Sequence, residues 1–126
     1  MSVSNPSRAL LAALAMAIPV LGLAAPAVDF NRDIRPLLSD NCFACHGPDT
    51  AKIKGGLRLD LRDAALAPAK SGKKAIVPGK PNDSELVRRI HSTDADDLMP
   101  PPETHKNLTA AQRDVLARWI ERSEEH

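Results

Sequence analysis

The spacing of hydrophobic and polar positions predicts short helices joined by long irregular stretches. A first helix is expected from about residue 29 to residue 46, with an apolar face at helical spacing made by Phe30, Ile34, Leu37 and Leu38. Asp29 is suited to cap its start, and Gly47-Pro48 to end it. Pro36 lacks an N–H donor, so either the helix bends there or its regular part begins there.

The clearest helix is the last one, which opens with Thr109-Ala-Ala-Gln112, the pattern of a capping box. An apolar stripe follows at Ala111, Val115, Leu116, Trp119 and Ile120. A shorter helix is expected over residues 84–91, with Ser84 as its cap and Leu86, Val87 and Ile90 on one face.

Between these helices, residues 50–83 and 92–107 are rich in glycine, proline and charged residues, which is typical of loops. The alternation of Leu57, Leu59 and Leu61 indicates a short extended piece. Aromatic residues are scarce, at 2% of the chain, so the apolar core is small for its length. Loops of this length inside one small domain suggest that a ligand organises it. The predicted fold class is therefore all-α, with short helices and long loops.

The N-terminus has the pattern of a secretory signal peptide. Arg8 precedes an Ala/Leu-rich run, and Ala25 and Ala27 form an A-x-A cleavage pattern. We expect residues 1–27 to be removed, leaving a single domain of residues 28–126. The alternative is an uncleaved anchor, since the apolar run approaches the roughly 20 residues that span a bilayer. In either case the sequence favours export to the bacterial periplasm or beyond.

Charge excludes some classes of partner. The chain carries 17 basic and 16 acidic residues, and only one of these, Arg8, lies before residue 28. The domain is therefore close to neutral, which argues against a nucleic-acid-binding protein. No membrane span is expected after cleavage of the signal peptide.

The stretch "DNCFACHGPD" holds the only two cysteines of the chain, Cys42 and Cys45, with His46 directly after the second. A redox dithiol would need a strand-to-helix turn of a thioredoxin-like sheet, and the flanking segments are predicted to be helical. A zinc site would need two further ligands at matching spacing, and no second cysteine pair is present. Covalent attachment of a c-type haem needs only this motif and export. The spacing puts both sulfurs on one side of a helical turn, and His46 can then reach the iron. We therefore expect one covalently attached haem c.

The iron of such a haem takes a second axial ligand or leaves that position open. After residue 28 the chain has one methionine, Met99, in the proline-bounded stretch "DDLMPPPE". A stiff loop loses little entropy when its thioether is held on the iron, so Met99 is the expected ligand. His91, His105 and His126 are the alternatives. Arg58 and Lys54, in the basic middle section, are candidate partners for the haem propionates.

On these residues the chain resembles the class I c-type cytochromes, and most closely the planctomycete-type cytochrome c domain. The similar segments are "DFNRDIRPLLSDNCFACHGPD", "KGGLRLDLRDAAL", "IVPGKPNDSELVRRI", "TDADDLMPPP" and "LTAAQRDVLARWI". The resemblance implies a cytochrome c-like fold wrapped around the haem, with His46 and Met99 as axial ligands. It also implies that the first and last helices pack crosswise, with Phe30 against Trp119.

The predicted function is one-electron transfer between a donor and an acceptor protein that the sequence does not identify, and not enzymatic catalysis. One alternative is a haem sensor or peroxidase-like domain with an open sixth position. Another is an electron-relay domain of a larger secreted protein, as the family usually forms part of such proteins. The sequence gives no oligomeric state.

Overall fold

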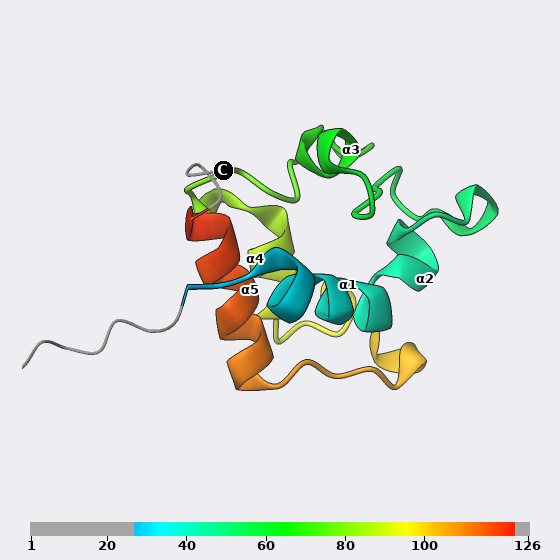
Figure 1. Ribbon diagram of the computed structural model, residues 1–126. Coiled ribbons are helices and arrows are strands. Elements are labelled where there is room, and N and C mark those ends of the chain that lie inside the picture. Colours follow the sequence, from blue (N-terminus) through cyan, green and yellow to red (C-terminus); the bar gives the residue numbers. More distant parts are fainter. Residues whose placement is uncertain (1–26, 123–126) are drawn as a thin grey trace, which may run out of the picture.

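The computed structural model describes residues 27–122, and within that range the regular elements are helices (Figure 1). In chain order they are η1 (Phe30–Ile34), α1 (Arg35–Asn41), α2 (Phe43–His46), η2 (Thr50–Lys52), α3 (Arg62–Leu66), η3 (Pro81–Asp83), α4 (Glu85–Ile90), η4 (Pro102–Thr104) and α5 (Ala110–Arg122). Residues 27–122 contain no strand, and the extended pairing found there is one isolated bridge between Pro68 and Lys74. The predicted all-α class, with short helices and long loops, is confirmed.

The first predicted helix is built in three pieces. Asp29 caps η1 as expected, because its carboxylate accepts a hydrogen bond of 2.8 Å from the backbone N–H of Arg32. The π-helical turn η1 then passes into α1, where Pro36 lies in the first turn and so removes no intrahelical hydrogen bond. Gly47 follows the last residue of α2, as the sequence predicted.

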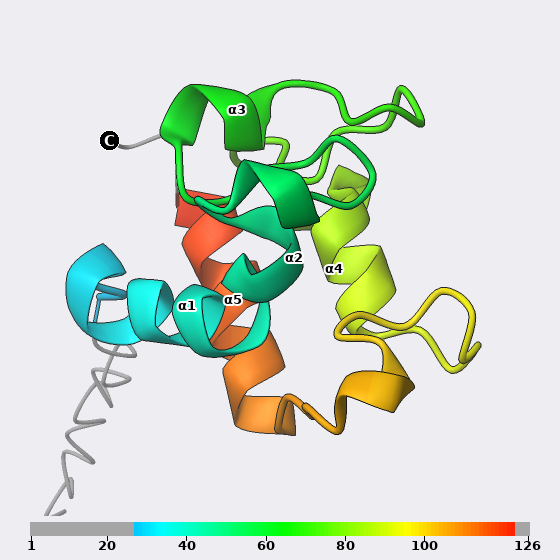
Figure 2. The ribbon, with the colours of Figure 1, turned by 90° about the vertical axis from the view of Figure 1, so that its right-hand side faces the viewer.

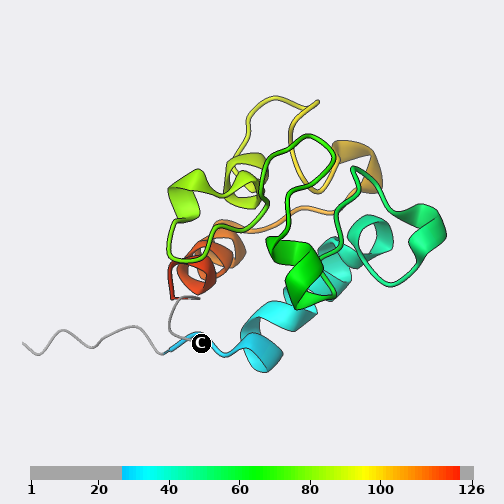
Figure 3. The ribbon, with the colours of Figure 1, turned by 90° about the horizontal axis from the view of Figure 1, so that it is seen from above.

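The N-terminal helices cross α5, and this crossing is the centre of the core (Figures 1 and 2). The rings of Phe30 and Trp119 meet there with centroids 5.7 Å apart and an angle of 39° between their planes. Ile34, Leu116 and Ile120 are at most 1% exposed. The crosswise packing and the predicted pair of aromatic residues are therefore confirmed. Seen from above, the N-terminal helices and the loop that precedes Met99 lie at opposite edges of the molecule (Figure 3).

The start of α5 is a capping box, as predicted. The N–H of Gln112 donates to the hydroxyl of Thr109 over 3.1 Å, and the N–H of Thr109 donates back to the Gln112 side chain over 2.9 Å. One member of the expected apolar stripe is wrong, because Ala111 is exposed. The buried positions of α5 begin at Leu116, more than one turn further along the helix, so Ala111 lies before the part of α5 that faces the core.

The helix predicted over residues 84–91 is observed as α4, but its predicted cap is wrong in detail. The Ser84 hydroxyl makes no hydrogen bond to the first turn of the helix. Instead it accepts a bond of 2.9 Å from the N–H of Val77 and donates over 2.9 Å to the carbonyl of Lys80. Ser84 is 1% exposed, so its hydroxyl satisfies buried loop groups that would otherwise lack partners.

The middle of the chain differs from the expected extended piece. Leu57 and Leu59 turn inward but pair with no strand, Leu61 is 49% exposed, and the short helix α3 follows directly. Five residues are too few to show a helical period, so the sequence pattern missed α3.

Backbone hydrogen bonds attach this middle section to the helices at intervals along its length. Lys70 donates to the carbonyl of Gly55 over 3.0 Å, so the section closes on itself. Further along, the N–H groups of Glu85 and Leu86 donate to residues 74 and 75, each over 3.0 Å. Gly79 donates to the carbonyl of Ile120 over 2.9 Å. The long loops are thus ordered by bonds to helix ends, where backbone groups lack intrahelical partners.

No helix among residues 27–122 is long and apolar enough to cross a membrane. The predicted signal peptide and its alternative as an anchor concern residues 1–27, and residues 1–26 lie outside the described part of the chain.

Because the core is centred on the crossing of η1 and α5, we expect two Leu→Ala substitutions to differ strongly in how much they lower the free energy of unfolding. Leu116→Ala removes a side chain that is 1% exposed and leaves a cavity in the core, so we expect it to lower the free energy of unfolding by about 2–5 kcal/mol. Leu61→Ala makes the same chemical change at a position that is 49% exposed, and we expect a loss below about 1 kcal/mol. Chemical denaturation of both variants checks this, and equal losses would contradict the described core.

Candidate cofactor site

Four residues that the sequence singled out line one cavity of about 370 Å³: Cys42, Cys45, His46 and Met99. Its walls are mostly apolar and come from α2, from residues 54–59, from α4 and from the loop that carries Met99. A volume of this size lies within the usual range for cofactor pockets, about 300–1,000 Å³. Residues more than 50 positions apart in the sequence thus meet at one site.

The His46 side chain has a defined orientation. Its Nδ1 lies 3.1 Å from the carbonyl oxygen of Leu57. Because a carbonyl can only accept, Nδ1 carries the proton, and Nε2 keeps its lone pair for a metal or a further donor. The same segment also binds the backbone of this residue, since Leu59 donates to the His46 carbonyl over 2.7 Å. A partner on the far ring nitrogen is the arrangement that metal-bound histidines commonly show.

The two cysteines are not joined by a disulfide. Burial raises the pKa of the Cys42 thiol to about 11; nearby Lys106 opposes this shift and Cys45 adds to it. The Cys42 thiol is therefore protonated at neutral pH, unlike the thiolates of redox-active cysteine pairs, whose pKa values are lowered. Within residues 27–122 no cluster of three or more His, Cys, Asp or Glu side chains is arranged to hold a metal ion. The cavity also has no further Cys or His to complete a zinc site with the cysteine pair.

Met99 lines the cavity although it lies more than 50 residues after His46 in the sequence. Its N–H donates to the carbonyl of Arg89 at the end of α4 over 3.2 Å, and Pro100 and Pro101 follow it in the cavity wall. Of the alternative ligands, His91 is exposed and its Nδ1 lies 2.8 Å from the Val87 carbonyl, outside the cavity. His105 is exposed as well and does not line the cavity, and His126 lies outside the described residues.

The predicted cationic residues separate into two groups. Arg58 does not line the cavity, and its guanidinium instead binds the carboxylate of Asp60 over 2.6 Å. The sequence could not show this, because the pairing depends on how residues 57–61 turn. Lys54 does line the cavity, and so do Lys73, Arg89 and Lys106, which no sequence motif indicated.

One carboxylate also lines this cavity, that of Glu85 in the first turn of α4. It accepts hydrogen bonds from Arg88 over 2.6 Å and from Arg89 over 3.1 Å. The hydrogen bond from Arg88 is the main reason that the pKa of Glu85 lies below its usual value. The spacing of Glu85 and Arg89, four residues apart on a helix, was the sequence signal for this pair.

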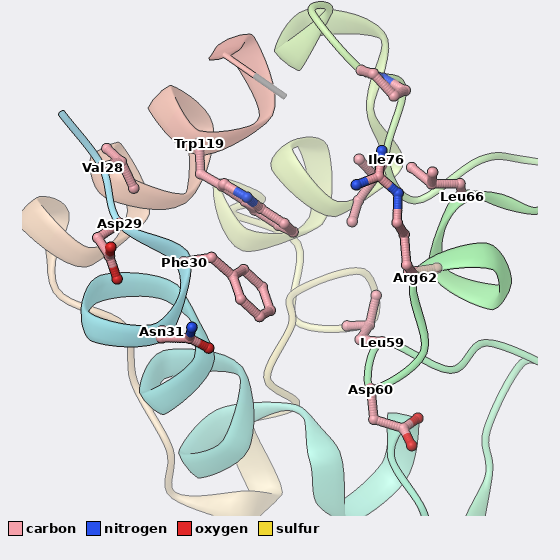
Figure 4. A pocket seen from close by; sticks show the side chains of 12 residues that line it. Val28, Asp29, Phe30, Asn31, Leu59, Asp60, Arg62, Leu66, Ile76 and Trp119 are labelled. Atoms are coloured by element: carbon pink, nitrogen blue, oxygen red, sulfur yellow. The ribbon is translucent and has the colours of Figure 1, made fainter. Parts of the chain in front are cut away.

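A second cavity of about 560 Å³ lies on the other side of Leu59, which lines both (Figure 4). Phe30 and Trp119 face Leu59 and Ile76 across it. No cysteine, histidine or methionine lines this cavity, so it lacks the groups that would attach a haem covalently or bind its iron in the expected way, although it is the larger of the two.

Comparison with known protein families decides between the interpretations of the cysteine motif. The family model described as Planctomycete cytochrome C matches residues 42–103. This match begins at Cys42, includes the whole haem motif and extends past Met99. This central segment of the chain belongs to that family. No curated protein and no solved structure matches the chain.

Family membership indicates a haem-binding, electron-transferring domain with a haem c cofactor. The residues present fit that cofactor. Two unpaired cysteines and a histidine with a free Nε2 stand on one wall of the cavity, apolar side chains line much of the rest, and four cationic side chains border it. Such a donor set suits covalent attachment, iron ligation and the binding of acidic groups. The observed short helices and long loops also fit the cytochrome c-like fold.

The close packing behind the haem motif leads to a prediction at Gly47. A Cβ at this position would lie 2.3 Å from the carbonyl oxygen of Phe43 and 2.8 Å from its Cα. Gly47→Ala must therefore displace the turn that carries Cys45 and His46. We expect a loss of about 1–3 kcal/mol in unfolding free energy. We also expect a lower fraction of exported chains that carry haem, measured by intact-mass spectrometry.

Gly72→Ala is the control for this substitution. Its Cβ would meet no atom within 4 Å, although its φ of 84° makes any side chain unfavourable there. We expect the unfavourable backbone conformation alone to lower the free energy of unfolding by about 1–2 kcal/mol, with unchanged haem loading. Full haem loading in Gly47→Ala would contradict the role given to this turn.

Proposed function

We propose that the protein is a mono-haem c-type cytochrome that transfers single electrons in the bacterial periplasm, with Cys42 and Cys45 as the attachment sites and His46 and Met99 as the axial ligands. The observation that carries this proposal is the meeting of all four side chains in one cavity. When bound, the haem supplies an iron that alternates between its ferric and ferrous states.

His46 is the ligand whose surroundings support the proposal best. The Leu57 carbonyl, 3.1 Å from Nδ1, holds the ring in the tautomer that leaves Nε2 free to bind iron. It also makes the imidazole a stronger donor, since the Nδ1–H is polarised toward an acceptor. Cys42 caps the start of the short helix α2, and Cys45 and His46 are its last two residues, so attachment and ligation use one turn.

Met99 lies in the same cavity, flanked by prolines that restrict the backbone. A thioether is a weak ligand, and a stiff loop lowers the entropy lost when the sulfur is held on the iron. Methionine together with histidine raises the reduction potential of a haem, which favours a carrier that accepts electrons readily.

The acidic groups of the haem need donors, and Lys54 is our main candidate because it lines the cavity. Arg58 stays a prediction without support from its position, since it is bound to Asp60. The donor and acceptor are proposed to be redox proteins. Export would follow from the predicted signal peptide of residues 1–27.

The competing proposal is a sensor or peroxidase-like haem domain with an open sixth position. Met99 in the cavity wall and the absence of any described histidine there besides His46 favour the electron carrier. A relay domain within a larger secreted protein would use the same site and the same chemistry, so it differs only in its attachment.

Haem attachment is tested directly by mass. Protein exported from a host with a cytochrome c maturation system should weigh one haem more than its polypeptide, and a pyridine haemochrome assay should give one haem per chain. We expect Cys42→Ser and Cys45→Ser to lose most of the covalent haem, because each removes one thioether. The bare polypeptide mass for the unsubstituted protein would overturn the proposed function.

The axial methionine is tested by absorption. The oxidised protein should show the far-red sulfur-to-iron band, and Met99→Leu should abolish it and lower the reduction potential. His91→Gln and His105→Gln are the matched controls and should keep both properties, because neither residue lines the cavity. A band that survives in Met99→Leu, or one that is absent from the unsubstituted protein, would exclude Met99 as the ligand.

A further inference from the structure

The end of α4 contacts the segment just before Met99 through several groups. The Arg88 guanidinium lies 3.3 Å from the Asp97 carboxylate, and that of Arg89 lies 3.9 Å from it. The Arg89 guanidinium also donates to the backbone carbonyl of Asp97 over 3.5 Å, and the backbone carbonyl of Arg89 accepts a hydrogen bond from the N–H of Met99 over 3.2 Å. Two adjacent arginines therefore hold the segment from Asp97 to Met99 against one helix end.

The arginines are themselves fixed by Glu85. Arg88 binds its carboxylate through two nitrogens, at 3.0 and 2.6 Å, and Arg89 binds it through Nε at 3.1 Å. The Glu85 side chain is only 16% exposed and lines the cavity. A two-point contact of this kind restricts the guanidinium, so less entropy is lost when it also binds Asp97.

The loop between α4 and Met99 has few other attachments. Asp94 accepts hydrogen bonds from the N–H groups of Asp96, Asp97 and Leu98, all within the loop itself. These bonds shape the loop but do not attach it to a neighbouring element. Its connection to α4 close to Met99 is therefore made by the Asp97 carboxylate, the Asp97 carbonyl and the Met99 N–H.

We propose that Asp97 and Arg88 are positioning residues that keep the Met99 sulfur in the cavity, by binding the loop of residues 92–99 to α4. The inference rests on the proposed ligation by Met99. In this proposal the ion pair determines what fraction of the time the sulfur is bound to the iron. It therefore also determines how readily an outside molecule binds at the sixth position. An exposed pair contributes little to global stability, but the bond it supports is weak, so a small change alters ligand exchange.

Asp96→Asn is the matched control for Asp97→Asn. Asp96 is the neighbouring residue and undergoes the same loss of charge, it is exposed, and its carboxylate makes no hydrogen bond or ion pair with any residue in 27–122. Any difference between the two variants therefore reports the contact with the arginines and not the net charge of the loop.

The experiment measures binding of neutral imidazole to the ferric haem protein, followed by loss of the far-red sulfur-to-iron band. Imidazole competes with Met99, so its apparent affinity rises with the fraction of open sites. We expect Asp97→Asn and Arg88→Gln to bind imidazole about three- to fivefold more tightly than the unsubstituted protein, the effect of losing one partly exposed ion pair. Asp96→Asn should bind imidazole within about 1.5-fold of the unsubstituted protein. Arg88→Lys keeps the charge but loses the two-point contact with Glu85, so its imidazole affinity should lie between those of the unsubstituted protein and Arg88→Gln.

Two further measurements make the test specific to the pair. The double variant Arg88→Gln/Asp97→Asn should bind imidazole no more tightly than the tighter-binding single variant, because the same interaction is lost in all three. Added salt should tighten imidazole binding to the unsubstituted protein and have a smaller effect on Asp97→Asn. The salt series needs no substitution, so it remains informative if a variant is poorly produced.

Failure of this inference and failure of the proposed function give different results. If the unsubstituted protein lacks the far-red band, Met99 is not the ligand, and both proposals are wrong. If the band is present and Asp97→Asn binds imidazole like Asp96→Asn, the ligation stands and the positioning role is overturned. The positioning role is also overturned if the two single variants change the imidazole affinity independently, so that their effects add in the double variant.

Discussion

Two hydrogen bonds to one histidine bind the irregular middle of the chain to the helix that carries the cysteines. The Leu57 carbonyl accepts from His46 Nδ1, and the Leu59 N–H donates to the His46 carbonyl. Because α2 is only four residues long, it cannot hold its shape or its side chains by helical propensity alone. The segment of residues 54–59 therefore supplies the support, and in doing so it selects the tautomer of the ring. Every function proposed for the cavity depends on that contact.

The remaining architecture explains how so small an apolar core can hold long loops. The crossing of η1 and α5 buries Ile34, Leu116 and Ile120, and Phe30 and Trp119 pack beside them. The loops then attach to this frame one backbone hydrogen bond at a time, and they leave a cavity between α2 and α4. A large flat apolar cofactor bound there would add the buried surface that the sequence does not provide.

The two walls of the cavity are held in different ways. The His46 wall is bound by backbone hydrogen bonds next to a covalent attachment motif, whereas the Met99 wall is bound to α4 by one backbone hydrogen bond and partly exposed ion pairs. Ion pairs at 30–45% exposure respond to salt and to single substitutions far more than buried backbone bonds do. This asymmetry makes the methionine wall the adjustable part of the site.

The sequence by itself determined the cysteine–histidine motif, the single available methionine and the capping box of α5, because each depends on residue types and short spacings. The aromatic pair at the helix crossing was predicted from the resemblance to a known family. The sequence pattern failed at Ala111, at the Ser84 cap, at α3 and in the surroundings of Arg58. Those features depend on which surfaces meet and how a loop turns, and the local pattern holds no record of either. Only the tertiary structure decided that the Leu57 carbonyl orients His46, that Glu85 and Arg89 border the cavity, and that Asp97 meets Arg88. The reason is physical: a backbone carbonyl has no residue signature, and an ion pair between a helix and a loop exists only once packing has brought its two charges together.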